Sequence, residues 1–308
     1  MSGTHNELAG DLAAVRSVAV IGTGLLGTSL GLALRRLGFT GSILGVGRNE
    51  ATLDHARQRG GIDRGSTDVA DAAGCDLIVL ATPVSTFARM LERLAAAGLN
   101  AATVLTDVGS TKRSVVELAE SLLPHPQRFV GSHPMAGSEQ RGPEAACATL
   151  FAGRPVVVTP TSRTDPEAEV LVSRLWSALG MRLVRLSPAD HDRVVARISH
   201  LPHALATLIV ELAEAADALP VASTGFADVT RVASGDPVIW ADIFSDNADA
   251  VVEAIDEVSE RLDELRERIA AGDREALRTW LLRNKQVRDG WKDPRTAPAA
   301  SDTAWRED

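Results

Sequence analysis

Residues 18–38 read VAVIGTGLLGTSLGLALRRLG, and this stretch decides the fold. A short β-branched run leads into glycines spaced as GxGxxG, and a helix-forming run follows them. In such a motif the first glycine makes a tight turn, the second lets the backbone approach a pyrophosphate, and the third allows close helix–strand packing. The stretch therefore predicts a dinucleotide site at a helix N-terminus. The expected cofactor-binding residues at this turn are Gly22, Gly24, Leu25, Leu26 and Gly27.

The chain on either side of this motif alternates in the same way. From residue 16 to residue 187, short β-branched runs alternate with longer amphipathic runs, which is typical of a parallel sheet with crossover helices. The sequence therefore predicts the α/β class, with a Rossmann-type, doubly wound, mainly parallel sheet and a second, all-helical domain. The expected strands are residues 17–22, 42–46, 76–81, 103–108, 128–132, 155–160 and 181–186.

The alternation of strands and helices stops at residue 187. Ser187, Pro188 and Asp190 are typical of a helix start, with a cap, a first-turn proline and an acidic residue near the positive end of the helix. The chain then reads as almost entirely helical. We expect a leader at 1–15, a dinucleotide-binding domain at 16–187, an all-helical domain at 188–291 and a disordered tail at 292–308.

An apolar seam marks the later part of the helical domain. It repeats at alternating spacings of four and three, which places its members on one narrow helix face. The partner helix that such a seam needs lies either in the same domain or in a second copy of the chain, and the second interpretation predicts a homodimer. The seam residues are Val251, Ile255, Val258, Leu262, Leu265 and Ile269.

The composition argues against several classes of protein. The 308 residues carry a formal net charge of −9, and no basic patch is found that would attract a nucleic acid. No apolar run approaches the ~20 residues of a membrane span, and the N-terminus shows no signal or transit pattern, so we expect a cytoplasmic protein with no membrane partner. Two cysteines without a CxxC pattern, and no other convincing ligand set, lead us to expect no metal.

The end of the second expected strand bears on the choice of cofactor. An acidic residue there would bind the adenosine ribose of NAD, but residues 45–50 read GVGRNE, with Gly47 at the acidic position and Arg48 after it. A guanidinium binds a 2′-phosphate well, which favours NADP, whereas Glu50 leaves NAD possible. The residues expected to complete the cofactor site, at the ends of later strands, are Thr82, Pro83 and Asp107.

Residues 129–142, FVGSHPMAGSEQRG, contain the main candidate for a catalytic base. An enzyme that oxidises an alcohol needs a group to accept the hydroxyl proton, and histidine titrates near neutral pH. His133 follows an expected strand, at the edge where ligands bind in open α/β sheets, and Pro134 and Gly137 shape a loop there. The alternative is that His133 is only a turn residue.

Three further histidines lie in the helical half. His200 and His203 flank Pro202, whose ring disrupts a helix, and they are either a structural pair or part of a site. His191 lies between two aspartates in a first helical turn, and we interpret it as a structural hydrogen-bonding residue.

Two polar stretches each allow two interpretations. In TDVGSTK, Ser110 is a helix N-cap whose hydroxyl would also face the ligand crevice. In FADVTRVASGDP, Asp228 and Arg231 are spaced i, i+3. They form an exposed ion pair of little energetic weight, or Arg231 binds a substrate carboxylate.

Taken together, six segments resemble the prephenate/arogenate dehydrogenase family of tyrosine biosynthesis. They occur in the family's order over nearly the whole chain, and SHPMAG and SHLPH are the most specific elements. The resemblance implies a Rossmann-type domain, a helical domain that builds the dimer, and NAD(P)-dependent oxidative decarboxylation of prephenate to 4-hydroxyphenylpyruvate. The segments are GTGLLGTSLGLAL, LATP, TDVGSTK, GSHPMAGSE, PADHDRVVARISHLPHALA and FADVTRVASGDPVIW.

The resemblance also implies roles for individual residues. His133 accepts the proton of the ring hydroxyl, and Ser110 hydrogen-bonds that hydroxyl and helps to hold His133. His200 lines the substrate pocket, and Arg231 binds a substrate carboxylate. The remaining residues expected at the substrate are Ser138, Glu139, His203 and Asp228, of which Glu139 and Asp228 form an ionic network around Arg231.

Three other functions compete with this one. An arogenate dehydrogenase would form tyrosine from a substrate with an amino acid side chain. His203 and the loop GSEQRGP are the candidates for making that choice. A β-hydroxyacid dehydrogenase would need a lysine in the helical half, where only Lys285 and Lys292 occur, near its end. A non-catalytic NADP-binding redox sensor would leave unexplained the joint presence of Ser110, His133, His200 and Arg231.

Overall fold

The structure is a computed structural model that describes residue 12 and residues 14–137 and 140–293. The chain divides into two compact units, the first ending at Asp192 and the second beginning at Arg193. The boundary expected from the sequence, between residues 187 and 188, lies slightly earlier, at the start of helix α7 (Pro188–Val195).

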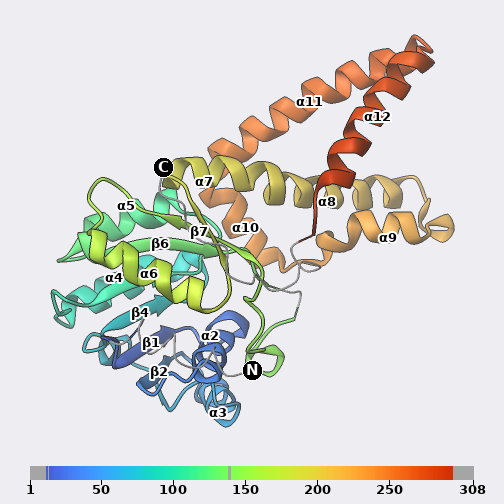
Figure 1. The fold of residues 1–308 in the computed structure, drawn as a ribbon. Coiled ribbons are helices and arrows are strands. Elements are labelled where there is room, and N and C mark those ends of the chain that lie inside the picture. Colours follow the sequence, from blue (N-terminus) through green and yellow to red (C-terminus); the bar gives the residue numbers. More distant parts are fainter. Residues whose placement is uncertain (1–11, 13, 138–139, 294–308) are drawn as a thin grey trace, which may run out of the picture. The chain divides into compact units, whose positions relative to one another are not determined.

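The first unit is built on one eight-stranded sheet in the order β3-β2-β1-β4-β5-β6-β7-β8 (Figure 1). The first six strands in this order are parallel to one another, as expected for a Rossmann-type sheet. The strands are β1 (Ser17–Ile21), β2 (Ser42–Val46), β3 (Arg64–Ser66), β4 (Leu77–Leu80), β5 (Val104–Asp107), β6 (Phe129–Pro134), β7 (Pro155–Thr159) and β8 (Arg182–Arg185).

Two features of this sheet differ from the pattern expected of the sequence. Strand β3 was missed, because its sequence RGS has no apolar residue and the strand lies at the sheet edge. Strand β7 pairs with β6 in the antiparallel direction, so β7 and β8 run against the other strands. Apolar runs predict that strands exist, but their direction depends on how the intervening chain crosses the sheet.

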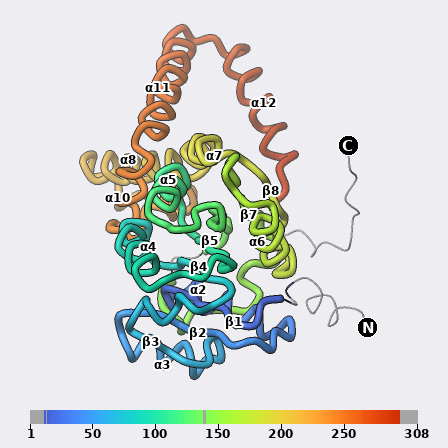
Figure 2. The backbone as a smooth tube through the Cα atoms, turned by 90° about the vertical axis from the view of Figure 1, so that its left-hand side faces the viewer, coloured from blue at the N-terminus to red at the C-terminus, as the bar shows by residue number. Residues whose placement is uncertain are grey.

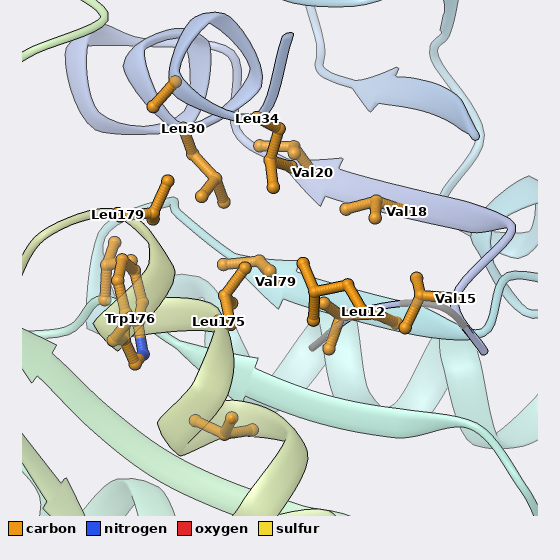
Figure 3. Close-up of a cluster of buried hydrophobic side chains, with 14 of the residues drawn as sticks. Leu12, Val15, Val18, Val20, Leu30, Leu34, Val79, Leu175, Trp176 and Leu179 are labelled. Carbon is orange, nitrogen blue, oxygen red and sulfur yellow. The ribbon is translucent and has the colours of Figure 1, made fainter. Parts of the chain in front are cut away.

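Helices cover both faces of the sheet. On one face, α2 (Leu25–Arg36), α3 (Glu50–Gln58) and α6 (Pro166–Ala178) enclose a core that includes Leu34, Val79 and Trp176 (Figure 3). On the other face, α4 (Phe87–Ala96) and α5 (Arg113–Leu122) enclose a second core. Strands buried on both faces explain the nearly continuous apolar runs in the sequence. Short 3-10 turns lie at Val69–Ala72, Val84–Thr86, Pro126–Arg128 and Pro143–Ala145.

Two residues of the expected leader belong to this core. Leu12 and Val15 are 3% and 6% exposed and pack with Val18 beside the first strand (Figure 3). Burying an aliphatic side chain contributes about 1.5–3 kcal/mol, so this part of the expected leader stabilises the first unit. The rest of the leader up to residue 11, and residues 294–308 of the expected tail, lie outside the described residues.

The second unit is helical throughout its described residues. Its two longest helices, α11 and α12, form a hairpin closed by a short turn (Figure 2). The elements after α7 are a π-helical turn (Ala196–His200), α8 (Leu201–Ala215), a 3-10 turn (Leu219–Val221), α9 (Thr224–Thr230), a second 3-10 turn (Arg231–Ser234), α10 (Pro237–Asp246), α11 (Ala248–Ala270) and α12 (Arg274–Gly290).

The apolar seam predicted for this unit lies on α11. At the start of the helix Val251 is buried with Ala254 against the π-helical turn. Farther along, Ile255, Leu262 and Ile269 are 40%, 53% and 59% exposed in the isolated chain. Val258 and Leu265 are half-buried, so the seam is fully buried within its own unit only at its start. Among the described helices none is long and apolar enough to cross a membrane.

Candidate active site

The glycine-rich turn after β1 has the geometry that a dinucleotide requires. Gly22 has φ +105°, and a Cβ there would lie 2.5 Å from the carbonyl oxygen of Ala81, so only glycine fits. A Cβ on Gly27 would overlap the carbonyl oxygen of Gly22. Gly24 differs, because a Cβ there would meet nothing within 4 Å. The absence of side chains at Gly22 and Gly27 lets the helix lie close against the sheet. The open space beside Gly24, at the N-terminus of α2, fits a pyrophosphate.

The other expected cofactor residues lie near the same sheet edge, with one difference. Arg48 follows β2 and is exposed, and Thr82 and Pro83 follow β4, the strand paired with β1. The strand order reverses between β1 and β4, which is where ligands bind in open α/β sheets. Asp107 ends β5, but its carboxylate is fully buried and binds protein groups.

His133 lies inside β6, opposite Val157 of β7, and its side chain is half-buried. The sequence-based expectation of a loop at this position was wrong, because antiparallel pairing with β7 extends β6 as far as Pro134. The ring is therefore carried by a paired strand, which restrains its backbone more tightly than a loop would.

A hydrogen-bonded chain leads from His133 to the first residues of α7. The Nδ1 atom of His133 lies 2.9 Å from Nε2 of His191, and the two rings meet edge to face with centroids 5.1 Å apart. The Nδ1 atom of His191 lies 2.7 Å from Oδ1 of Asp192. His191 was expected to be a structural hydrogen-bonding residue; its hydrogen bond goes to the candidate base.

The carboxylate of Asp192 also caps helix α5. Its Oδ1 and Oδ2 atoms accept hydrogen bonds from the backbone amides of Lys112 and Arg113, each at 2.8 Å. The expectation that Ser110 is the N-cap was therefore wrong, because α5 begins later, at Arg113, and a carboxylate from a distant part of the chain satisfies its first amides. Ser110 itself is half-buried in the segment between β5 and α5.

The surroundings of the hydrogen-bonded residues determine the protonation states of Asp192 and His191. Burial acts to raise the pKa of the Asp192 carboxyl, but hydrogen bonds from His191 and the two backbone amides outweigh burial and hold this pKa below its usual range. Burial lowers the pKa of His191, and although the hydrogen bond to Asp192 opposes this, the pKa stays below its usual range. Near neutral pH, Asp192 is therefore ionised and His191 is neutral.

A second buried network supports the strand beneath His133. Asp107 and Lys112 form a fully buried ion pair. The Oδ1 atom of Asp107 accepts a hydrogen bond from the backbone amide of Ser132 at 2.9 Å, and the indole of Trp176 donates to Oγ of Ser132 at 3.0 Å. These contacts hold Ser132, the residue that precedes His133. Removing one partner of a buried ion pair costs about 3–5 kcal/mol, so the pair of Asp107 and Lys112 is not easily lost.

The second unit holds the remaining histidines around the turn of Pro202. Proline cannot donate a backbone hydrogen bond and its ring crowds the preceding turn, which explains the π-helical turn at Ala196–His200. His200 is 1% exposed, and the Nδ2 amide of Asn247 lies 3.2 Å from its Nδ1 atom. The predicted disruption of the helix is confirmed.

His203 packs differently from His200. Its ring stacks on that of Trp240 with centroids 3.6 Å apart and an interplanar angle of 11°. Phe244 lies beside both rings, with its centroid 5.7 Å from that of Trp240 and 6.0 Å from that of His203. Burial lowers the pKa of His203. The ring is therefore a packed, neutral group within the helical unit.

The other expected substrate residues are exposed or lie outside the described residues. Asp228, in α9, and Arg231, directly after it, are both exposed in the isolated chain. Ser138 and Glu139 lie outside the described residues. Within the described ranges, no group of three or more histidine, cysteine, aspartate or glutamate residues is arranged to hold a metal ion.

Sequence reasoning missed three residues of this arrangement. His191 was given only a structural role, and Asp192 and Lys112 were not considered for the site. In sequence, His133 and His191 are 58 residues apart, and Lys112 and Asp192 are 80 residues apart. The one local signal was the dipeptide His191-Asp192 at a helix start.

Comparisons with known proteins identify the relatives of this chain. A profile described as "Prephenate dehydrogenase, nucleotide-binding domain" matches residues 30–185, and one described as "Prephenate dehydrogenase, dimerization domain" matches residues 187–283. A prephenate dehydrogenase of Bacillus subtilis is 34% identical, with 89% of this chain and 76% of that protein covered. A cyclohexadienyl dehydrogenase of Zymomonas mobilis is 31% identical, with 89% and 95% covered.

Solved structures agree with the sequence relatives. The prephenate dehydrogenase of Aquifex aeolicus, in complex with hydroxyphenyl propionate and NAD+, matches with a TM-score of 0.84 and 36% identity, over 89% of this chain and 97% of that one. An arogenate dehydrogenase of Synechocystis matches with a TM-score of 0.78 and 31% identity, over 89% and 99%. Both expectations, the family and the two-part fold, are confirmed. The chain belongs to the prephenate dehydrogenase family of nicotinamide-dependent oxidoreductases.

Proposed function

We propose that this chain catalyses the NADP-dependent oxidative decarboxylation of prephenate to 4-hydroxyphenylpyruvate, with His133 as the base. The observation that carries the proposal is the hydrogen-bonded chain from Asp192 through His191 to His133, beside a sheet edge built for a dinucleotide. A histidine held by a second group that is itself anchored is the arrangement expected of a general base.

The residues of the chain divide the chemical work between them. A bound nicotinamide cofactor supplies the acceptor for the hydride that leaves the carbinol carbon. His133 takes the hydroxyl proton, so the carbonyl forms without a charged intermediate. The bond to the ring carboxylate then breaks and carbon dioxide departs. The electron pair of that bond makes the ring aromatic and moves the carbonyl electrons onto its oxygen, which takes back a proton to become the phenol hydroxyl. Ser110 would hydrogen-bond the hydroxyl, and Arg231 would bind a carboxylate that does not react.

The choice of NADP rests on the end of β2. Gly47 brings no carboxylate to the position where NAD-binding sheets carry one, and the exposed guanidinium of Arg48 comes next. Asn49 caps α3 through its side chain, at 2.9 Å from the amide of Ala51, which fixes the chain beside Arg48. Arginine binds phosphate in a bidentate manner, so this end of the strand favours a 2′-phosphate.

A two-by-two assay tests the proposal. Reduced cofactor is followed at 340 nm with prephenate or arogenate, each combined with NAD or NADP. We expect the highest kcat/KM with prephenate and NADP. Higher kcat/KM with arogenate would assign the chain to the alternative substrate, and no reduction in any of the four combinations would support the NADP-binding sensor.

A matched pair of arginine variants extends the cofactor arm of this assay. Arg48→Ala should raise the KM for NADP and leave the KM for NAD unchanged. Arg57→Ala is the control, because Arg57 is also exposed in this unit and forms an ion pair with Asp54, three residues before it in α3. An equal effect of Arg48→Ala on both cofactors would remove Arg48 from 2′-phosphate recognition.

We also propose that the second unit forms a homodimer through the exposed seam of α11. A helix face with Leu262 and Ile269 more than half exposed is the kind of surface that a second copy buries. Light scattering should give twice the chain mass, and Leu262→Glu with Ile269→Glu should give a monomer. The matched control is Val221→Glu, which alters a residue that is 85% exposed outside the seam. A monomeric wild-type protein would contradict the proposal.

A further inference from the structure

The chain of hydrogen bonds in the first unit has a defined polarity. The carboxylate of Asp192 is ionised, accepts two backbone amides of α5 and has no proton to donate. The contact of 2.7 Å between Asp192 Oδ1 and His191 Nδ1 therefore requires the proton to be on Nδ1 of His191. The orientation of the whole chain begins at this anchored carboxylate.

The second link follows from the neutral state of His191. This ring is fully buried, and a neutral imidazole that carries its proton on Nδ1 has a lone pair on Nε2. That Nε2 atom lies 2.9 Å from Nδ1 of His133, so Nδ1 of His133 carries the proton that is donated to it. In neutral His133 the proton is then absent from Nε2.

We infer that His191 and Asp192 are positioning residues, which hold His133 in the tautomer whose Nε2 atom accepts the substrate proton. The inference rests on the proposed role of His133 as the base, and it names the nitrogen that acts. In the reaction the O–H bond of the substrate breaks and an N–H bond forms at Nε2. The positive charge on His133 is then stabilised by the Asp192 carboxylate through His191. The protons on Nδ1 of His133 and Nδ1 of His191 stay where they are in this step.

Other charged groups also act on the relay from the elements around it. Lys112, at the start of α5, disfavours a charge on His191, whereas Asp192 and the more distant Asp107 favour one. Lys112 is itself paired with Asp107, and the carboxylate in direct contact with His191 is that of Asp192. Removing that carboxylate should therefore reverse the direction of the hydrogen bonds from Asp192 to His133.

The direct test measures the tautomer of His133 in the whole wild-type protein. With 15N-labelled histidine, NMR distinguishes ring nitrogens that carry a proton from those that do not. The signals of His133 are assigned by their loss in His133→Asn. At about pH 8, where histidine is neutral, we expect a proton on Nδ1 and none on Nε2. A proton on Nε2 in the wild-type protein would overturn the inference, whether or not the protein oxidises prephenate.

A kinetic test uses Asp192→Asn. Its side-chain oxygen can still accept a backbone amide of α5, but its NH2 group would donate to Nδ1 of His191 and reverse both tautomers. We expect kcat to fall about 10²–10⁴-fold with little change in KM, as expected when a base presents the wrong tautomer. The acid limb of the pH profile of kcat/KM should also move to lower pH, because the carboxylate that favours charged His133 is gone.

The matched control for Asp192→Asn is Asp165→Asn. Asp165 also caps a helix of the first unit, by accepting the amide of Glu167 at 2.9 Å, so it reports the effect of losing a capping carboxylate. Equal kcat and pH profiles for the two variants would overturn the inference. If Asp192→Asn fails to fold, the wild-type tautomer decides. Activity that is present in the wild type and lost in His133→Asn would keep the proposed function in either case.

Discussion

Replacing His133 with asparagine should lower kcat about 10²–10⁴-fold, the usual contribution of a positioned general base. The side chain is half-buried in β6, and asparagine is smaller, so the core networks under the strand stay intact. Because the base acts in the transition state, KM for prephenate should change far less than kcat. Steady-state kinetics at saturating cofactor measure both quantities.

The control for this variant is His55→Asn. His55 is also in the first unit, but its exposed ring is paired with Glu144, so its loss should leave kcat unchanged. Thermal unfolding of both variants checks that the fold is retained. Near-normal turnover by His133→Asn would exclude His133 from proton transfer.

The second large effect is expected for Arg231→Ala, mainly in KM. Losing the cationic partner of a bound carboxylate typically costs about 2–5 kcal/mol, which corresponds to about 30-fold or more in affinity. Arg231 lies directly after α9 and is exposed in the isolated chain, so its removal should cost the fold little. Initial rates over a range of prephenate concentrations measure the effect.

Arg197→Ala is the matched control in the same unit. Its guanidinium binds Glu253 and Glu257 of α11 on the surface, so this variant also loses an arginine with carboxylate partners. The KM for prephenate should not change in it. An unchanged KM in Arg231→Ala as well would make Arg231 a structural residue.

Most of the first unit could be predicted because its strands are buried on both faces. Segments such as 76–81 are continuous apolar runs, and the spacing of Gly22, Gly24 and Gly27 specifies the first turn. The edge strand at Arg64–Ser66 gave no such signal, because an edge strand needs few buried side chains. The antiparallel direction of β7 depends on a crossover that local periodicity does not encode.

The site was less predictable than the fold, because its contacts join distant parts of the chain. Sequence motifs selected His133, yet the expected capping role of Ser110 failed since Asp192 supplies that cap from 80 residues away. Nothing in the sequence around His191 indicates that its ring meets His133. Local patterns predict which residue types can act, whereas tertiary packing decides which of them touch.

The most direct measurement of the central claim is the stoichiometry of the reaction. Purified protein is mixed with NADP and prephenate labelled with 13C at the ring carboxylate, and reduced cofactor, labelled carbon dioxide and 4-hydroxyphenylpyruvate are quantified together. The account predicts equal amounts of all three. Reduced cofactor without release of labelled carbon dioxide, or no reduced cofactor at all, would contradict it.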